Sequence, residues 1–136
     1  MPSSTTSSEV TRVLIVDDNE EMLSRAAAVL GSGCVVVAAV TNGPAALKAA
    51  GSLRPDVIVL DIGMVGMNGF EVAARLRDSG STAAVVFFTV HDDEEFVNAA
   101  KAVGGMGYVV KPRLAADLLL AVREAKARRP FVSAMR

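Results

Sequence analysis

The sequence is poor in cysteine and in aromatic residues: it contains one cysteine and no tryptophan, and only 4% of its residues are aromatic. The single cysteine, Cys34, excludes an internal disulfide. Its place at the start of an apolar run predicts a buried core thiol in a reducing compartment. The chain also lacks an apolar run of the roughly 18 residues that a membrane span needs, and its N-terminus lacks the basic and apolar regions of a signal peptide. We therefore expect a cytoplasmic protein with no membrane partner.

Neither sign of charge is in excess. Fourteen basic residues stand against fifteen acidic ones, for a formal net charge of −1. Such a balance excludes a global field that would attract nucleic acid. The basic residues near the C-terminal end, Lys126, Arg128 and Arg129, are better explained as complements of a helix dipole than as a nucleic-acid patch of their own.

Apolar residues are abundant, at 51% of 136 residues, which suffices for one domain with a core of Val, Leu, Ala and Ile. The first residues are polar and rich in Ser and Thr. We predict a disordered N-terminal tail at residues 1–10 and one folded domain at residues 11–130. Residues 131–136 are then the C-terminal end or the start of a linker.

Short apolar runs alternate regularly with amphipathic segments along this domain. The runs are too short for helices and are not interrupted by polar residues, as in strands buried on both faces. We predict five strands, at residues 13–16, 35–40, 56–61, 84–89 and 106–110, with a helix after each. This order indicates an α/β fold, a doubly wound (βα)5 sandwich in which helices cover both faces of an open parallel sheet.

Four of the apolar runs end in residues that can bind a metal ion or a phosphate group. The terminating residues are Asp17 with Asp18, Asp61, Thr89 and Lys111. Since ligands of open α/β sheets bind beyond the carboxyl ends of the strands, we expect these side chains to meet at one edge. Taken singly, each has an ordinary explanation as a helix cap, a turn residue or a solvated charge. Chance placement of all of them at carboxyl ends is far less probable.

The three carboxylates of this set need a counter-ion. At about 4 Å, two like charges repel by about 4 kcal/mol at an effective dielectric near 20. Mg²⁺ meets the need because it takes one or two carboxylates together with phosphate oxygens. A carboxylate can also attack phosphorus to give an aspartyl phosphate, whose oxygens a hydroxyl and an ammonium group would stabilise.

Five segments carry a resemblance to a known family: Val13–Asp18, Pro55–Ile62, Met67–Gly69, Phe88–Thr89 and Gly107–Pro112. With them the chain resembles, over about residues 11–128, the receiver domain of two-component response regulators. The resemblance implies a flavodoxin-like, chemotaxis-regulator-like fold with strand order 2-1-3-4-5.

The resemblance also implies a role for each site residue. Asp61 would be the phosphoacceptor and a metal ligand. Asp18 would bind Mg²⁺ directly, Asp17 mainly through water, and the backbone carbonyl of Gly63 would complete the metal site. Thr89 and Lys111 would contact the phosphoryl group. The peptide bond before Pro112 is often cis in this family.

A switch follows from the same resemblance. Phosphorylated Asp61 would pull Thr89 inward, and the freed space would let Tyr108 turn from solvent toward the interior. That change would repack the face formed by the fourth helix, the fifth strand and the fifth helix, where partners usually bind. A rim tyrosine that never moves is the alternative.

Two positions depart from the family pattern. Val65 stands where Pro is usual, and Val90 stands where a small residue is usual after the threonine. The only histidine, His91, follows Val90. We expect Gly63, Val90 and His91 together to set the lifetime of the phosphorylated state; the ordinary alternative for His91 is a surface residue at the start of a helix.

The expected function is that of a phosphoacceptor signalling domain fed by a sensor histidine kinase. It would not be an enzyme beyond self-phosphorylation from small donors and autodephosphorylation. The part from Gly104 onward resembles receivers that precede a helix-turn-helix domain, so we expect transcription control through a DNA-binding domain absent from this chain, and a homodimer on phosphorylation. Alternatives are a stand-alone receiver, a receiver-like module that takes no phosphate, and an aspartyl-phosphate phosphohydrolase.

Overall fold

The computed structural model describes residues 10–133. The predicted tail at residues 1–10 lies outside this range apart from Val10. Of the predicted C-terminal segment, 131–136, the first three residues are described.

The domain is an α/β sandwich built on one parallel sheet. Its elements, in chain order, are β1 (Arg12–Val16), α2 (Glu20–Leu30), β2 (Val35–Val40), α3 (Gly43–Leu53), β3 (Val57–Asp61), α4 (Gly69–Asp78), β4 (Ala84–Thr89), α5 (Glu94–Ala102), β5 (Gly107–Val110), the 3₁₀ turn η1 (Lys111–Arg113), α6 (Leu114–Lys126) and β6 (Phe131–Val132). The sheet order is β2-β1-β3-β4-β5-β6. The predicted order of the first five strands is therefore present, with one strand added.

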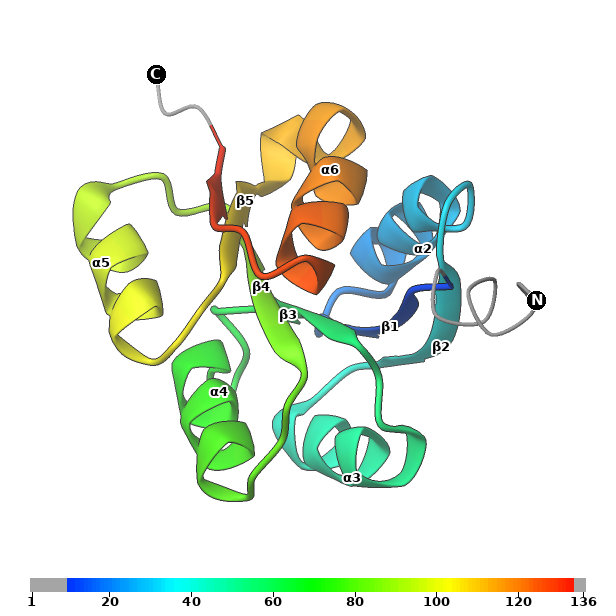
Figure 1. The fold of residues 1–136 in the computed structure, drawn as a ribbon. Helices are drawn as coiled ribbons and strands as arrows, with labels where there is room; N and C mark the ends of the chain where they lie inside the picture. Colours follow the sequence, from blue (N-terminus) through cyan, green and yellow to red (C-terminus); the bar gives the residue numbers. More distant parts are fainter. Residues whose placement is uncertain (1–9, 134–136) are drawn as a thin grey trace.

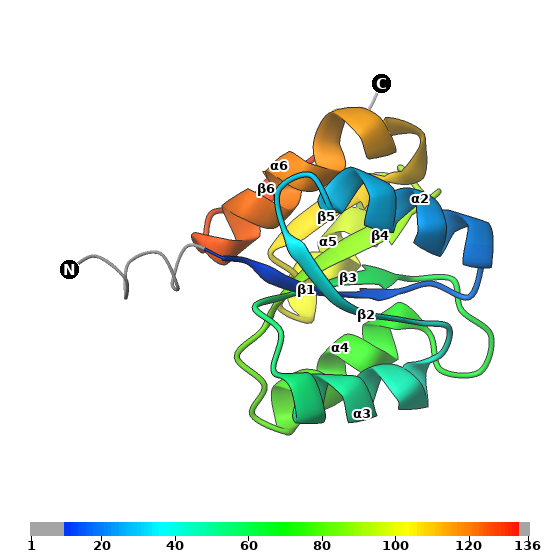
Figure 2. The ribbon, with the colours of Figure 1, turned by 90° about the vertical axis from the view of Figure 1, so that its right-hand side faces the viewer.

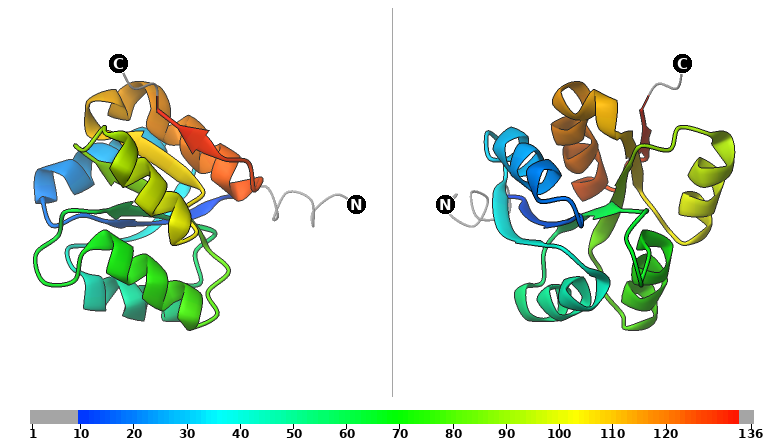
Figure 3. Two further views of the ribbon diagram at one scale, coloured as in Figure 1. Left: turned by 90° about the vertical axis from the view of Figure 1, so that its left-hand side faces the viewer. Right: turned by 180° about the vertical axis from the view of Figure 1, so that it is seen from behind.

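Helices cover both faces of the sheet, as Figures 1 and 2 show. The helices α2 and α6 lie on one face, and α3, α4 and α5 lie on the other (Figure 3). Successive residues of each central strand point to opposite faces. Leu14 and Ile58 belong to the core beneath α3, α4 and α5, whereas Val13 and Val57 belong to the core beneath α2 and α6. This is why the strands read as uninterrupted apolar runs.

Asparagines start the helices that follow β1, β2 and β3. The side chains of Asn19, Asn42 and Asn68 each accept a hydrogen bond from a backbone N–H in the first helical turn. The Glu71 carboxylate in turn accepts a hydrogen bond from the Asn68 amide, which completes a capping box. These caps begin α2, α3 and α4 at the edge of the sheet where the strands end.

The sixth strand, β6, corrects the five-stranded prediction. It pairs in parallel with β5, Gly107 opposite Phe131 and Tyr108 opposite Val132. Two residues are too few for an alternating pattern, so only the pairing defines this strand. The folded unit therefore extends past residue 130, into the segment predicted to be an end or a linker.

Three further observations bear on predictions made from the sequence. Cys34 is half-buried rather than fully buried, and burial raises the pKa of its thiol against the lowering effect of Arg123. Residues 10–133 contain no cis peptide bond, so the bond before Pro112 is trans. Within the same residues, no helix is long and apolar enough to cross a membrane.

Candidate phosphoacceptor site

The predicted site residues converge at the carboxyl edge of the sheet. Asp17 directly follows β1, Asp61 ends β3, Thr89 ends β4 and Lys111 directly follows β5. The parallel register aligns these ends, with Asp61 opposite Phe88 and Thr89 opposite Val110. The central position of β3 puts Asp61 between the acids that follow β1 and the hydroxyl at the end of β4.

Three carboxylates lie close together at this edge. One oxygen from each of Asp17, Asp18 and Asp61 falls within 4.8 Å of the other two. Asp17 is fully buried, Asp61 is 5% exposed and Asp18 is exposed. Asp17 Oδ1 accepts a hydrogen bond from the Asn19 amide at 2.9 Å, and Asp61 Oδ1 accepts one from the Gly63 amide at 3.2 Å.

Lys111 supplies the positive charge that faces this cluster. Its Nζ lies 2.8 Å from Asp17 Oδ2 and 3.5 Å from Asp61 Oδ1. The contact with Asp17 is close enough for an ion pair but lacks hydrogen-bond geometry, so buried Asp17 Oδ2 has no hydrogen-bond partner among residues 10–133. The ammonium also lies 5.5 Å from the centre of the Phe88 ring, a cation–π contact. One ammonium group thus opposes three carboxyl groups.

The electrostatics at Asp61 follow from this imbalance. Burial and the neighbouring Asp17 raise the pKa of the Asp61 carboxyl, and Asp18 adds to the rise. Lys111 and the Gly63 amide act in the opposite direction but do not cancel it. Its charged form is therefore less stable than that of a solvated aspartate.

These residues fit a divalent cation. Carboxylate oxygens are the ligands that Mg²⁺ prefers, and a second positive charge would relieve the repulsion among the three acids. Oδ2 of buried Asp17, which lies against Lys111 but accepts no hydrogen bond from the described residues, could bind such an ion.

The start of α4 packs tightly against the backbone at the end of β3. The backbone of Gly69 approaches the end of β3 so closely that a Cβ there would collide with the Asp61 carbonyl and with Ile62 Cα. The Gly69 amide donates to the Ile62 carbonyl at 2.9 Å. A glycine is needed for this approach, which explains its place in the motif Met67–Gly69.

Thr89 and Tyr108 are joined through the backbone of His91. Thr89 Oγ1 accepts a hydrogen bond from the His91 amide at 3.2 Å, and the Tyr108 hydroxyl donates to the His91 carbonyl at 2.8 Å. The His91 ring stacks on Phe96 at a centroid distance of 4.0 Å. The sequence predicted that Thr89 and Tyr108 act together, but not that the His91 backbone joins them, because hydrogen bonds to main-chain groups leave no residue-type signal.

Tyr108 differs from the predicted starting position. Its side chain is already in the interior, 2% exposed, rather than turned toward solvent. Burial, with Asp93 and Asp92 nearby, raises the pKa of its hydroxyl to about 12. The bond to the His91 carbonyl satisfies the hydroxyl there, which makes the buried position stable.

Gly63, one of the positions predicted to set the lifetime of the phosphorylated state, and the two departures from the family pattern, Val65 and Val90, are all exposed. Gly63 is exposed and touches the acid cluster through its amide. Val65 is 90% exposed and Val90 is 67% exposed. Large apolar side chains at such exposure contribute nothing to the core, so neither valine is explained by packing.

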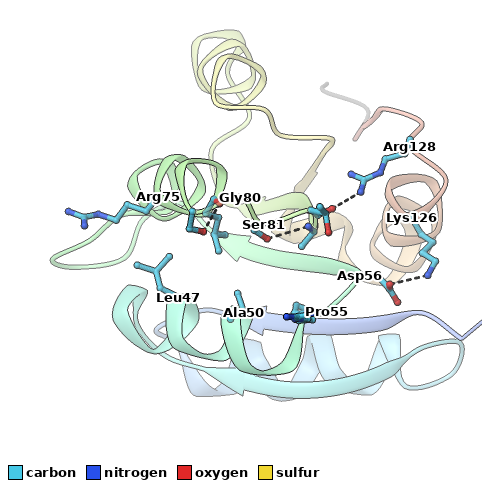
Figure 4. Close-up of a pocket in the computed structure, with 15 residues that line it drawn as sticks. Leu47, Ala50, Pro55, Asp56, Arg75, Gly80, Ser81, Lys126 and Arg128 are labelled. Carbon is cyan, nitrogen blue, oxygen red and sulfur yellow. Dashed lines mark hydrogen bonds and ion pairs between the residues drawn. The ribbon is translucent and has the colours of Figure 1, made fainter.

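A pocket lies at the opposite edge of the sheet. It encloses about 810 Å³ at the amino ends of β3 and β4, and Figure 4 shows the side chains that line it. Lys126 pairs with Asp56 there at 3.1 Å. The basic residues Arg54, Arg75 and Lys126 stand at the C-terminal ends of α3, α4 and α6, where cations complement helix dipoles. None of the predicted site residues lines this pocket.

Comparison with known proteins places the chain in a family. The response regulator receiver domain family matches residues 13–123, and the chain belongs to this family. It is a receiver domain of two-component response regulators, a class of signalling domain.

Individual relatives support this assignment. The positive alginate biosynthesis regulatory protein of Pseudomonas aeruginosa is 43% identical over 116 residues, which cover 83% of this chain and 46% of that protein. The nitrate/nitrite response regulator NarL of Escherichia coli is 34% identical over 121 residues, covering 88% of this chain and 56% of NarL. The chain therefore spans about half the length of these relatives.

A solved structure of a receiver domain has the same fold over most of this chain. The signal receiver domain of the putative response regulator NarL from Mycobacterium tuberculosis superposes with a TM-score of 0.84 at 29% identity. The match covers 89% of this chain and 99% of that domain.

Proposed function

We propose that this receiver accepts a phosphoryl group on Asp61 from the phosphohistidine of a sensor histidine kinase, with Mg²⁺ as cofactor. The observation that carries the proposal is the position of Asp61, whose carboxylate lies between two further acids and Lys111. In the transfer, an Asp61 oxygen forms the bond to phosphorus while the phosphorus–nitrogen bond of the donor breaks, and the imidazole leaves.

Asp17, Asp18, Asp61 and the backbone carbonyl of Gly63 would hold the metal. When bound, Mg²⁺ neutralises charge on the carboxylates and on the phosphoryl oxygens. The half of the site toward β4 and β5 then serves the incoming group. Thr89 would donate its hydroxyl to one phosphoryl oxygen, and Lys111 would move from Asp17 toward another.

Of the three acids, Asp61 is the best placed nucleophile. Asp17 is fully buried, with one oxygen bonded to an amide and the other against Lys111. Asp18 is exposed, and the ion pairs of Lys111 are with Asp17 and Asp61. Asp61 has both the metal-binding acids and the phosphoryl-binding groups as neighbours, which an aspartyl phosphate requires.

The signal would leave the site through Thr89 and Tyr108. Because the Tyr108 ring is already buried, phosphorylation would change how its hydroxyl and the His91 backbone are held, rather than turn the ring inward. The face of α5, β5 and α6 would carry the change to a partner. In the longer protein this partner would be a DNA-binding domain, with a homodimer formed on phosphorylation. Gly63, Val90 and His91 would set the lifetime of the phosphorylated state.

Phosphorylation by a small donor tests the proposal. Incubation with acetyl phosphate and Mg²⁺ should add one phosphoryl mass to the intact chain, and omission of Mg²⁺ should prevent it. Asp61→Asn should abolish the gain because an amide is not a nucleophile toward phosphorus. Asp56→Asn, at the opposite edge, is the matched control and should be phosphorylated as fast as wild type. A phosphoryl mass that survives in Asp61→Asn would refute the assignment.

A further inference from the structure

The last residues of the described chain form a strap, Phe131 to Ser133, along the outer edge of β5. The strap follows α6 and lies beyond residue 123, where the family match ends. It contains β6, which is drawn in red beside β5 in Figure 1. The Phe131 amide donates to the Met106 carbonyl at 3.2 Å, and the Ser133 amide donates to the Tyr108 carbonyl at 2.8 Å.

Ser133 fastens the end of this strap through its side chain. The residue is 1% exposed. Its hydroxyl donates to Asp117 Oδ2 at 2.8 Å and accepts from the Val110 amide at 3.3 Å. Asp117 is itself held by Arg113, through Nε at 2.7 Å and Nη2 at 3.2 Å. The hydrogen bonds from Arg113 keep the pKa of Asp117 below its usual range, so an ionised acceptor is ready for the Ser133 hydroxyl.

Two routes connect this fastening to the phosphoacceptor site. Along the first, Val110 immediately precedes Lys111, whose Nζ pairs with Asp17. Along the second, the Tyr108 carbonyl accepts from the Ser133 amide while the Tyr108 hydroxyl donates to the His91 carbonyl. The His91 amide in turn donates to Thr89 Oγ1. Both routes end on Ser133, and both begin on a residue proposed to bind the phosphoryl group.

Side-chain packing alone holds the strap weakly. Phe131 is half-buried and Val132 is 39% exposed. A cavity of about 320 Å³ lies between the strap and α5, lined in part by Val97, Ala100 and Tyr108. A segment with so little buried apolar surface opens at low cost, so its docking depends on the hydrogen bonds of Ser133.

We propose that the strap is a phosphorylation-controlled latch: it is docked on β5 when Asp61 is unphosphorylated and released when Asp61 carries a phosphoryl group. The proposal rests on the proposed function of Asp61. Phosphoryl oxygens compete with Asp17 for the Lys111 ammonium. They also accept the Thr89 O–H, and the movement of the Thr89 side chain toward them would draw its oxygen away from the His91 amide, from which it now accepts a hydrogen bond. Both routes that hold Ser133 in place therefore lose their present anchor on phosphorylation. The strap would carry the signal to the chain that follows α6.

Amide hydrogen exchange of the 136-residue chain tests the latch without any substitution. Beryllofluoride with Mg²⁺ serves as the stable mimic of the phosphoryl group. On its binding, exchange of the Phe131 and Ser133 amides should accelerate about tenfold, within the usual range of coupling between sites. The Leu14 amide, in the centre of the sheet, should keep its rate. Unchanged or slower exchange in the beryllofluoride-bound protein would overturn the latch and leave the proposed function of Asp61 intact.

Thermodynamic reciprocity supplies the second readout. If the bound mimic weakens strap docking, a substitution that undocks the strap must strengthen binding of the mimic by a comparable factor. Ser133→Ala should therefore bind beryllofluoride more tightly, up to about tenfold by calorimetry. The matched control is Ser32→Ala, which removes an exposed hydroxyl that donates to the Val29 carbonyl, and it should bind as wild type does. Equal affinity in wild type and Ser133→Ala refutes the latch, whereas failure of wild type to bind at all contradicts the proposed function and the latch together.

Discussion

The two edges of the parallel sheet each carry a lysine–aspartate pair, yet the surroundings of the two pairs are opposite. At the carboxyl edge, Lys111 lies against Asp17 with side chains 12% and 0% exposed, and two more acids are close by. At the amino edge, Lys126 lies against Asp56 with side chains 33% and 31% exposed. The first pair lies within an excess of buried negative charge, whereas the second is solvated and stands among other cations.

This difference shows at which edge a bound cation would lower the electrostatic energy. Solvent already screens the amino edge, and its cations match the C-terminal ends of helices. The carboxyl edge retains repulsion that a cation relieves. The edge that fits a cation is therefore the one with unbalanced buried charge and not the one with the pocket.

The largest effect is expected from removing each lysine in turn. Lys111→Met leaves Asp17 and Asp61 without their cation and should lower the free energy of unfolding by roughly 3 kcal/mol, as for one partner of a buried pair. Lys126→Met breaks a half-buried pair and should cost about 1 kcal/mol or less. Urea denaturation without Mg²⁺ measures both, and equal losses would show that the two edges are electrostatically alike.

The stabilisation of the fold by Mg²⁺ should distinguish the two edges almost as strongly. At about 100 times its dissociation constant, Mg²⁺ should raise the free energy of unfolding by about 2.7 kcal/mol, because only the folded chain brings the acids together. Asp18→Asn should remove most of this gain, and Asp56→Asn should retain all of it. Thermal denaturation with and without Mg²⁺ provides the measurement. A gain unaltered in Asp18→Asn would place the ion elsewhere.

The charge of Asp61 should lower the stability of the metal-free protein. Its folded pKa is raised, chiefly by burial and by Asp17. A raised pKa stabilises the fold below the unfolded value, and that contribution is lost as pH rises through the folded value. At neutral pH, Asp61→Asn should therefore unfold at a higher urea concentration than wild type, and the gap should narrow as pH falls through the folded pKa of Asp61. A gap independent of pH would contradict the assigned cause.

The smallest effect concerns Tyr108, the only tyrosine in a chain without tryptophan. Its phenolate absorbance should appear with a pKa of about 12, mainly because the ring is buried. The folded pKa exceeds the ordinary value, so stability should fall as pH rises from 10 toward 12. Asp92→Asn and Asp93→Asn should shift the titration only slightly downward. A titration near the ordinary value would mean that the ring faces solvent.

Much of the site was predictable because it depends on strand ends. A strand buried on both faces is a short apolar run, and the first polar residue after it marks the edge where strands end. Asp17, Asp61, Thr89 and Lys111 could be placed at one edge on that basis, and the structure brings them there. The three asparagine caps have the same local character, since a cap contacts only its own helix.

The contacts that join these residues were not predictable. The closer approach of Lys111 to Asp17 than to Asp61 spans 94 positions and depends on side-chain geometry at the edge. The buried position of Tyr108 depends on a carbonyl acceptor at His91, which any residue could supply. The two residues of β6 show no strand pattern in the sequence. They form a strand because they pair with the edge of β5 and because the Ser133 hydroxyl is hydrogen-bonded to Asp117.

The sequence by itself determined the alternation of strands and helices, the parallel sheet and the residues at its carboxyl edge, because strand burial and helix capping act over a few neighbouring residues. Only the tertiary structure decided that Lys111 lies closer to Asp17 than to Asp61, that the Tyr108 side chain is buried, and that the chain after α6 returns to the sheet. Those outcomes rest on hydrogen bonds and charges between residues far apart in the chain. Their strength depends on burial, which exists only once the sheet is assembled.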